Sequence, residues 1–158
     1  MNDIIIRSAV TSDVNMIHEV LVCAFSPYKD HYTQQAYDMT VCVRDEVSRR
    51  IEDKTIDVLV AVREGQIAGT AALHYRKEGR LYLSSMAVDP IVQGKGMGYY
   101  LLKAVEERAR DKGCSVISLE CCEFLKMAIA LYRRMGYERT GNKRPYYGVE
   151  VFEMQKRL

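Results

Sequence analysis

Apolar residues along the chain change their spacing several times, and each change predicts a new element. Residues 4–7 form a short β-branched run, which indicates a strand. Potential cap residues at 11–13 then precede an apolar stripe at Val14, Ile17, Leu21 and Ala24. A spacing of three to four residues puts side chains on one face of a helix, so an amphipathic helix is expected after the first strand.

The helical spacing returns after a polar stretch that contains Pro27. Apolar residues recur there every four residues, at Met39, Val43, Val47 and Ile51. This pattern predicts a second helix from about 34 to 53.

The next part of the chain has the pattern of β-strands. Residues 57–62 are rich in β-branched side chains, Glu64-Gly65 supplies a turn, and 67–75 continues extended. A further turn at 77–79 leads into a third run, 81–88. Three runs joined by short turns predict an antiparallel meander.

In the last third of the chain, helical spacing returns, and predicted helices then alternate with predicted strands. A helix is expected from Gly98, with an apolar face and with Glu106 placed to pair with Arg110, and residues 115–121 read as a strand. A helix at 124–134, a strand from about 137 and a last strand at 149–154 follow.

The order of these elements predicts the fold class. A strand, a helix and a further strand make a crossover, so the strands at 81–88 and 115–121 should be parallel neighbours. The full order is β-α-α-β-β-β-α-β-α-β-β, which predicts an α/β fold with a single mixed sheet of about seven strands and helices on both faces.

Composition narrows the class of protein. The chain has 158 residues, with 23 Lys and Arg against 21 Asp and Glu, and a formal net charge of +2. This balance excludes a globally basic nucleic-acid binder, so no nucleic-acid partner is expected. With 48% hydrophobic residues, we expect a single globular domain over 1–158. No apolar run approaches the roughly 18 residues of a membrane helix, and residues 1–7 lack the features of a signal peptide, so neither a membrane partner nor secretion is expected.

The five cysteines are an odd number in a chain without an export signal. This argues against a disulfide framework and makes the cytoplasm the expected compartment. Cys121 and Cys122 are adjacent and lack the spacing of a redox pair or a zinc site. We expect two buried thiols at the end of a strand, and no metal.

The densest chemical signal is the run Gln93-Gly94-Lys95-Gly96-Met97-Gly98, between a predicted strand and the start of a predicted helix. Glycines let the backbone come close to a ligand, and the first amide N–H groups of a helix have no partners within it. Such a loop is an anion site, and a pyrophosphate is the ligand that it would suit.

Spacing tests two familiar nucleotide-binding motifs. A P-loop needs Ser or Thr after its lysine, and here Gly96 follows Lys95, so that interpretation fails. A dinucleotide fingerprint needs a third glycine where this chain has Tyr99, and its turn should follow the strand without the intervening residues 89–93. Because Glu120 stands about twenty residues downstream, as a ribose-binding acid would, a nucleotide-binding oxidoreductase stays open as the less favoured alternative.

The run 86–98, which reads MAVDPIVQGKGMG, resembles the motif of the GNAT superfamily of N-acetyltransferases, Q/R-x-x-G-x-G/A after a strand ending V-x-P or V-D-P. A second family motif, L-Y-x-x-x-G-F/Y, is matched by LYRRMGY at 131–137, at the spacing that the family uses. The helix before it usually opens N-x-x-A, whereas this chain has Leu125 in the Asn position. The order of elements resembles the family over essentially the whole chain.

The resemblance implies acetyl-CoA as co-substrate and a splay between the fourth and fifth strands that receives its pantetheine arm. Backbone groups of Met86, Ala87 and Val88 would bind the arm like an added strand, and an N–H near Ala87 could face the thioester oxygen. The loop from 93 to 98 would cradle the pyrophosphate. The expected cofactor-binding residues are Met86, Ala87, Val88, Gln93, Gly94, Lys95, Gly96, Met97, Gly98, Tyr99 and Leu125.

The resemblance also implies two catalytic residues. An amine with a pKa of about 10, like that of Lys, is protonated at neutral pH, so a base must remove a proton before attack. Glu120 matches a carboxylate that acts as base, usually through water, in part of the family; a glutamate that only hydrogen-bonds backbone at the splay is the alternative. Tyr132 matches the family's usual proton donor to the leaving thiolate, and packing on the cofactor is the alternative.

The acceptor side carries weaker signals. Tyr28, Tyr32 and Tyr146 lie in regions that line the acceptor groove in relatives, although ordinary half-buried packing would also explain them. His31 and His74 are weaker candidates for the base.

These observations lead to one main prediction and one alternative of the same fold. The main prediction is an acetyl-CoA-dependent N-acetyltransferase that acts on a primary amine of a small molecule, a peptide or a protein. The alternative is a catalytically silent CoA-binding sensor or interaction module, which Leu125 alone favours. The resemblance leaves a homodimer open.

Overall fold

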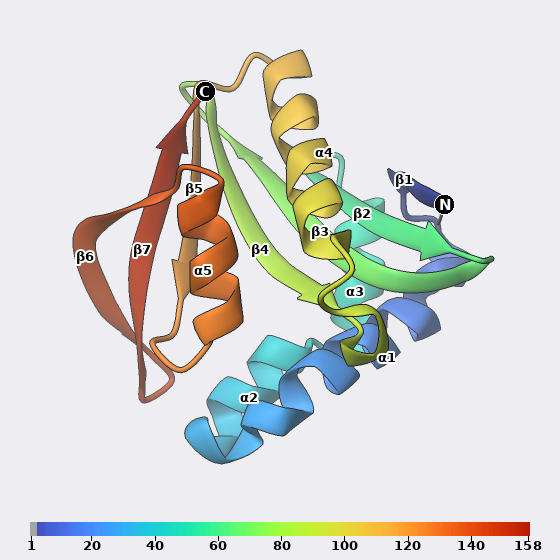
Figure 1. Ribbon diagram of the computed structural model, residues 1–158, viewed down its shortest axis with the longest axis horizontal. Helices are drawn as coiled ribbons and strands as arrows, with labels where there is room; N and C mark the ends of the chain where they lie inside the picture. The colour runs from blue at the N-terminus through green and yellow to red at the C-terminus, as the bar shows by residue number, and fades with distance from the viewer. Residues whose placement is uncertain (1–2) are drawn as a thin grey trace.

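The computed structural model describes residues 3–158 (Figure 1). Its strands are β1 (Ile4–Ser8), β2 (Ile56–Arg63), β3 (Gln66–Arg76), β4 (Arg80–Val88), β5 (Val116–Cys121), β6 (Glu138–Tyr146) and β7 (Val149–Arg157). Its α-helices are α1 (Val14–Phe25), α2 (Gln34–Val41), α3 (Arg44–Glu52), α4 (Met97–Asp111) and α5 (Lys126–Arg134). Three 3-10 turns, η1 (Thr11–Asp13), η2 (Ser26–His31) and η3 (Pro90–Val92), complete the described elements.

The strands form one mixed seven-stranded sheet in the order β1-β2-β3-β4-β5-β7-β6. Neighbours are antiparallel except β4 and β5, which are parallel, as the crossover through α4 predicts. Their pairing runs from Arg80 opposite Val116 to Leu83 opposite Leu119, although β4 continues to Val88. The two strands therefore separate beyond Leu83, which confirms the expected splay, and Figure 1 shows β4 curving away from β5.

A bulge bends β4 where the separation begins. The register between β3 and β4 shifts from Thr70 opposite Ala87 to Ala72 opposite Ser84, so β4 has an extra residue there. Ser85 lies within the bulge at a φ of +49°, in the left-handed region that a non-glycine residue rarely adopts. Because a bulge bends its strand and increases its twist, the end of β4 turns away from β5 and leaves that backbone edge without a neighbouring strand.

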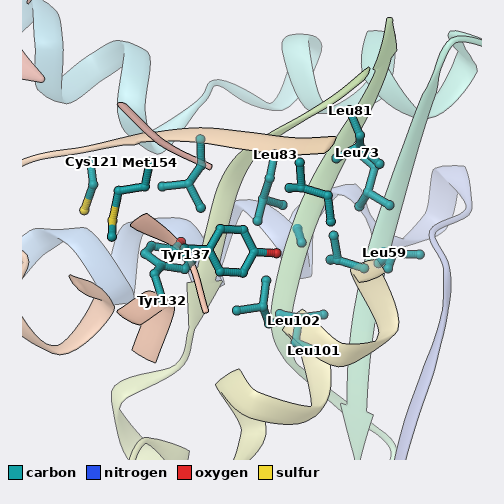
Figure 2. Close-up of a cluster of buried hydrophobic side chains, with 14 of the residues drawn as sticks. Leu59, Leu73, Leu81, Leu83, Leu101, Leu102, Cys121, Tyr132, Tyr137 and Met154 are labelled. Carbon is teal, nitrogen blue, oxygen red and sulfur yellow. The ribbon is translucent and has the colours of Figure 1, made fainter. Parts of the chain in front are cut away.

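Helices cover both faces of the sheet, as expected. Alternate residues of β2 point to opposite sides: Leu59 packs in the cluster that contains α4 and α5, and Val60 packs in the cluster that contains α1 and α3. Figure 2 shows the first cluster, in which Leu101 and Leu102 of α4 approach leucines of β2, β3 and β4. The alternation of a half-buried strand thus produces two cores, one on each face.

The predicted single helix over 34–53 is wrong, because the structure has two helices, α2 and α3, in this region. Cys42 interrupts the helix with a φ of +55°, and Val43 is extended and begins α3 as its N-cap residue. Met39 and Val43 are 48% and 59% exposed, so the four-residue spacing did not trace a continuous buried face. The buried residues of α2 are Ala36, Tyr37 and Val41.

The end of β5 and the start of α5 lie close to where the sequence predicts them. The helix expected at 124–134 begins at Lys126, and Cys121 and Cys122 are buried at the end of β5, as predicted. Across residues 3–158, no helix is both long enough and apolar enough to span a membrane.

Candidate functional site

A cavity of about 650 Å³ lies at the opening between β4 and β5. Its wall includes the predicted site residues Tyr28, Tyr32, Met86, Ala87, Val88, Gln93, Gly94, Gly96, Met97, Gly98, Tyr99, Glu120, Leu125, Tyr132 and Tyr146. Lys95 belongs to the same loop but is not among the residues that line the cavity. The fold thus brings together segments from the first helices, the glycine loop and the last hairpin, which are far apart in the sequence.

The glycine loop begins α4 with open backbone amides. Gly94 and Gly96 have φ values of +80° and +83°, which glycine adopts without strain, and Gly96 is the N-cap residue of α4. The amides of the first turn have no earlier carbonyl within the helix. Together with the helix dipole, they make this end of the cavity favourable for an anion.

Side chains hold the loop in position. The Gln93 amide donates from Nε2 to the carbonyl of Val88 at 3.1 Å, which joins the loop to the end of β4. A Cβ at Gly98 would lie 3.0 Å from Cδ2 of Leu131, so α4 and α5 approach closely at this point. The missing side chain allows the two helices to meet beside the cavity.

Tyr132 approaches the cavity from the face of the sheet that α4 and α5 cover. It is 7% exposed, and its ring centroid lies 5.8 Å from that of Tyr137 (Figure 2). Burial, above all, raises the pKa of Tyr132, so its hydroxyl stays protonated at neutral pH. A neutral phenol in this position can donate a proton.

Glu120 approaches the cavity from the opposite face. Leu119 and Cys121, on either side of it in β5, pack in the α4 and α5 cluster, so Glu120 points the other way. Arg144 of β6 holds its carboxylate in a two-point ion pair of 2.6 and 2.5 Å, and the Tyr82 hydroxyl donates to it at 3.2 Å. The described partners of this carboxylate are therefore side chains from β4 and β6, and its role as a base stays a prediction.

Tyr82, Ser84 and His74 lie on the same face as Glu120. The sequence indicated neither Tyr82 nor Ser84, whereas His74 was a weaker candidate for the base. His74 is the register partner of Tyr82 in the neighbouring strand, and its Nε2 lies 2.7 Å from the Ser84 hydroxyl. Burial, with a smaller effect of Arg50, lowers the pKa of His74 to about 4, so the ring is neutral at pH 7. Burial raises the pKa of Tyr82 to about 12. Strand alternation from the buried Leu81 and Leu83 is the signal that could have placed Tyr82 and Ser84 on this face.

Aromatic side chains pack together beside the cavity. Tyr28, His31 and Tyr32 pack around Phe124, with ring centroids 6.1, 4.8 and 5.0 Å away from it. The Thr33 hydroxyl donates to the carbonyl of Tyr147 at 2.6 Å, which ties the start of α2 to the β6–β7 hairpin. Tyr28 and Tyr32 therefore do pack against other side chains, and they also form part of the cavity wall.

The two cysteines next to Glu120 are poor nucleophiles. Burial raises the pKa of Cys121 to about 12 and that of Cys122 to about 11, so both thiols are protonated at neutral pH. In the part of the chain that the structure describes, no group of three His, Cys, Asp or Glu side chains is arranged to hold a metal ion.

Comparison with known proteins gives consistent matches. An IAA acetyltransferase of Azospirillum brasilense is 36% identical over 92 residues, which are 58% of this chain and 60% of that protein. A streptothricin acetyltransferase of Streptomyces lavendulae is also 36% identical over 92 residues, which are 57% of this chain and 49% of that protein. The matches thus span about half to three fifths of the length of these relatives.

Solved structures match over nearly the whole chain. The PaiA N-acetyltransferase of Thermoplasma acidophilum, solved in complex with coenzyme A, has a TM-score of 0.83 at 18% identity and covers 99% of both chains. A ribosomal-protein-alanine N-acetyltransferase of Brucella melitensis has a TM-score of 0.76 at 27% identity and covers 98% of this chain and 99% of that one. The family model described as the acetyltransferase (GNAT) family matches residues 14–137, so the chain belongs to the GNAT family of acetyltransferases.

Proposed function

We propose that this protein is an acetyl-CoA-dependent N-acetyltransferase that moves the acetyl group directly to a primary amine of a small molecule, a peptide or a protein. One observation carries the proposal: Glu120 and Tyr132 lie on opposite faces of the sheet and line the same cavity at the opening between β4 and β5. A base and an acid placed on either side of an opening suit a reaction in which an amine enters from one face and a thiol leaves on the other.

The residues present fit acetyl-CoA as co-substrate. The end of β4, from Met86 to Val88, offers a backbone edge without a neighbouring strand, along which a pantetheine arm can add like a strand. The glycine loop and the first turn of α4 offer N–H groups to a pyrophosphate. A Cβ at Gly94 would meet nothing within 4 Å, so the loop is open on that side, in keeping with the coenzyme A complex of the Thermoplasma relative.

Leu125 replaces the usual polar residue at the start of α5. It is the N-cap residue of that helix, packs against the core and lines the cavity. The proposed site therefore holds the arm through the β4 backbone and apolar contact here, without an Asn side chain at this position.

As part of this proposal, we assign the proton transfers to two side chains. Glu120, oriented by Arg144 and Tyr82, takes a proton from the ammonium group of the acceptor, directly or through water. A backbone N–H near Ala87 donates to the carbonyl oxygen while negative charge develops on it. The free amine attacks the thioester carbon, and the C–S bond breaks while Tyr132 gives its proton to the departing thiolate; burial keeps Tyr132 protonated until that step. The attacking nitrogen loses its second proton as the amide forms, and this proton restores the neutral Tyr132, directly or through water.

A thermal-shift measurement separates this proposal from dinucleotide binding. Acetyl-CoA should raise the Tm, because a ligand that binds only the folded state stabilises that state, whereas NAD should leave it unchanged. Stabilisation by NAD alone would end the proposal.

Thiol release from acetyl-CoA then separates an enzyme from a silent CoA-binding module. The panel should include polyamines, amino acids, aminoglycosides and peptides, since the names of the relatives include both streptothricin and a ribosomal-protein alanine as objects of acetylation. At least one amine should increase thiol release above the rate without amine. A protein that binds acetyl-CoA but responds to no amine would be the silent module.

A further inference from the structure

We infer that the amine acceptor is a small molecule that carries a carboxylate, and that Arg50 of α3 binds this carboxylate. We call the part of the cavity on the Glu120 face of the sheet, where the amine would enter, the acceptor end. This inference rests on the proposed function. It adds to that function the class of acceptor and a residue that selects it.

Arg50 is a largely buried cation on the cavity wall. Its side chain is 17% exposed, and it lies in the last turn of α3. Nε donates to Glu46 at 3.2 Å, and Nη1 donates to the Ser85 hydroxyl at 2.8 Å. A guanidinium has five N–H donors in a planar fork, and within residues 3–158 these two contacts use only part of them. The remaining donors are free to bind a ligand in the cavity.

The charge of Arg50 is only partly balanced by Glu46. That carboxylate also accepts two hydrogen bonds from Arg49, at 2.6 and 2.9 Å, so two guanidinium groups share it. Asp53, just beyond the end of the helix, lies 3.5 Å from the Arg49 side chain. Of the charged side chains of α3, Arg50 lines the cavity, whereas Asp45, Glu46, Arg49 and Glu52 do not, so α3 presents a positive charge there.

Other ionisable groups on the cavity wall do not cancel this charge. His74 is neutral at pH 7, and Arg50 and Arg76 both help to lower its pKa. Glu120 is already paired with Arg144. A partly buried charge is stabilised by an opposite charge that also hydrogen-bonds to it. An acceptor with one negative group would supply that charge.

The shape of Arg50 favours a carboxylate. The planar fork of a guanidinium matches the two oxygens of a carboxylate, which can accept two parallel hydrogen bonds. Ser84 and Ser85 line the cavity beside Arg50 and place hydroxyl groups there. One guanidinium with small hydroxyl neighbours is suited to a singly charged planar anion.

Contacts beside the acceptor end of the cavity favour a small acceptor over a folded protein. The Thr33 contact with Tyr147 links α2 to the β6–β7 hairpin, and Phe124 packs against η2 and Tyr32. Tyr32 and Tyr146, next to these contacts in the sequence, form part of the cavity wall. These contacts join both sides of the acceptor end and restrict the room for a long chain.

The test uses pairs of amines that differ only in the carboxylate. Glycine, β-alanine, γ-aminobutyrate, leucine and lysine are each compared with the corresponding amide by thiol release from acetyl-CoA. For at least one pair, kcat/KM should be about 10- to 100-fold higher for the carboxylate, as expected for a charged hydrogen-bonded contact. Arg50→Gln should bring that ratio close to one, mainly by raising KM for the carboxylate.

Two further variants control for structural effects. Arg49→Gln removes an arginine that shares Glu46 but is 58% exposed and does not line the cavity, so the ratio should persist. Ser85→Ala removes the hydroxyl that Arg50 contacts at the bulge. If Arg50 acts only by supporting the bulge, Ser85→Ala and Arg50→Gln will slow both members of a pair alike, and the inference is wrong.

The outcomes separate this inference from the proposed function. If carboxylates and amides are acetylated equally well, or if the ratio survives Arg50→Gln in a protein that still binds acetyl-CoA, the inference fails while the enzyme activity stands. If no amine of any kind releases thiol, the proposed function fails, and the inference fails with it.

Discussion

At the scale of single residues, the proposed chemistry depends on two side chains that line one cavity from opposite faces of the sheet. Tyr132 could be identified from its motif, and Glu120 from its place at the end of a strand. Their surroundings could not be predicted, because Tyr82 and Arg144 reach Glu120 from strands 38 and 24 residues away in the chain. Arg50 escaped prediction for the same reason, since its place on the cavity wall depends on how α3 packs against the bulge in β4.

Tyr132→Phe should slow acetyl transfer about 10²- to 10⁴-fold, the usual contribution of a positioned acid. Its Tm should change little, because the phenyl ring preserves the buried packing. The measurement is steady-state thiol release over a range of pH. An unchanged rate at every pH would rule out Tyr132 as the proton donor.

Glu120→Gln should lower kcat/KM most at neutral pH, where the acceptor is protonated and needs a base. The deficit should narrow as the pH approaches the pKa of the acceptor amine, about 10 for a Lys-like group, because the free amine then needs no base. The measurement is the pH profile of kcat/KM for both proteins. A deficit of constant size across this range would leave Glu120 only a structural role.

At the scale of elements, apolar and β-branched runs predicted most of the strands and of the helices that cover them, because each of these packs one face in the core. The strand β6 was predicted from the turn at 135–137 instead, and it has no buried residue. Apolar periodicity failed at Cys42, where a change in backbone direction breaks a run whose spacing still looks helical. The bulge at Ser85 was also not predictable, because no glycine marks its left-handed conformation and its contact with Arg50 comes from the distant helix α3. The loop Gly94–Gly96, in contrast, was readable because glycines mark it directly.

The junction of β1 with α1 should make stability depend on pH. Asp13 is a buried carboxylate that accepts two bonds from Arg7, at 2.7 and 3.1 Å, and one from the Val10 amide at 2.8 Å. The hydrogen bonds from Arg7 are the main cause that lowers the pKa of Asp13 below its ordinary value of 3.8. Because the folded pKa is the lower one, this stabilisation is present above about pH 4 and is lost as the pH falls further.

Asp13→Asn should therefore reduce the free energy of unfolding at pH 7 by about 1–2 kcal/mol. Urea denaturation across pH 2–7 should show that the difference from the unchanged protein shrinks below about pH 4. A difference that is the same at both ends of this range would show that the ion pair does not contribute.

At the scale of the whole molecule, the opening that forms the site also weakens the sheet, because β4 and β5 pair over only four residue positions. The opening divides the molecule into one half with β1–β4 and α4 and another half with β5–β7 and α5. Away from the opening, one buried carboxylate joins the two halves. Glu106 of α4 is 4% exposed, binds Lys156 of β7 at 2.9 Å, and accepts a bond from Tyr137 at 3.1 Å. Arg110, the partner that the sequence predicts for Glu106 within the helix, lies 4.0 Å away, whereas Lys156 and Tyr137, from other elements, make the closer contacts.

Glu106→Gln should lower the free energy of unfolding by about 2–3 kcal/mol, because it leaves the Lys156 ammonium, 23% exposed, without its buried partner. Tyr137→Phe, which removes only one hydroxyl contact, should cost about 1 kcal/mol. Thermal or urea denaturation measures both. If Glu106→Gln is as stable as the unchanged protein, the two halves do not depend on this group.

The most direct test of the central claim is mass analysis of the products formed from acetyl-CoA and an amine identified by the panel. The account predicts one N-acetylated amine for each coenzyme A released, and loss of both products together in Tyr132→Phe. Coenzyme A that appears without an equal amount of acetylated amine, or acetylated amine that forms equally fast without the protein, would contradict direct transfer at the opening between β4 and β5.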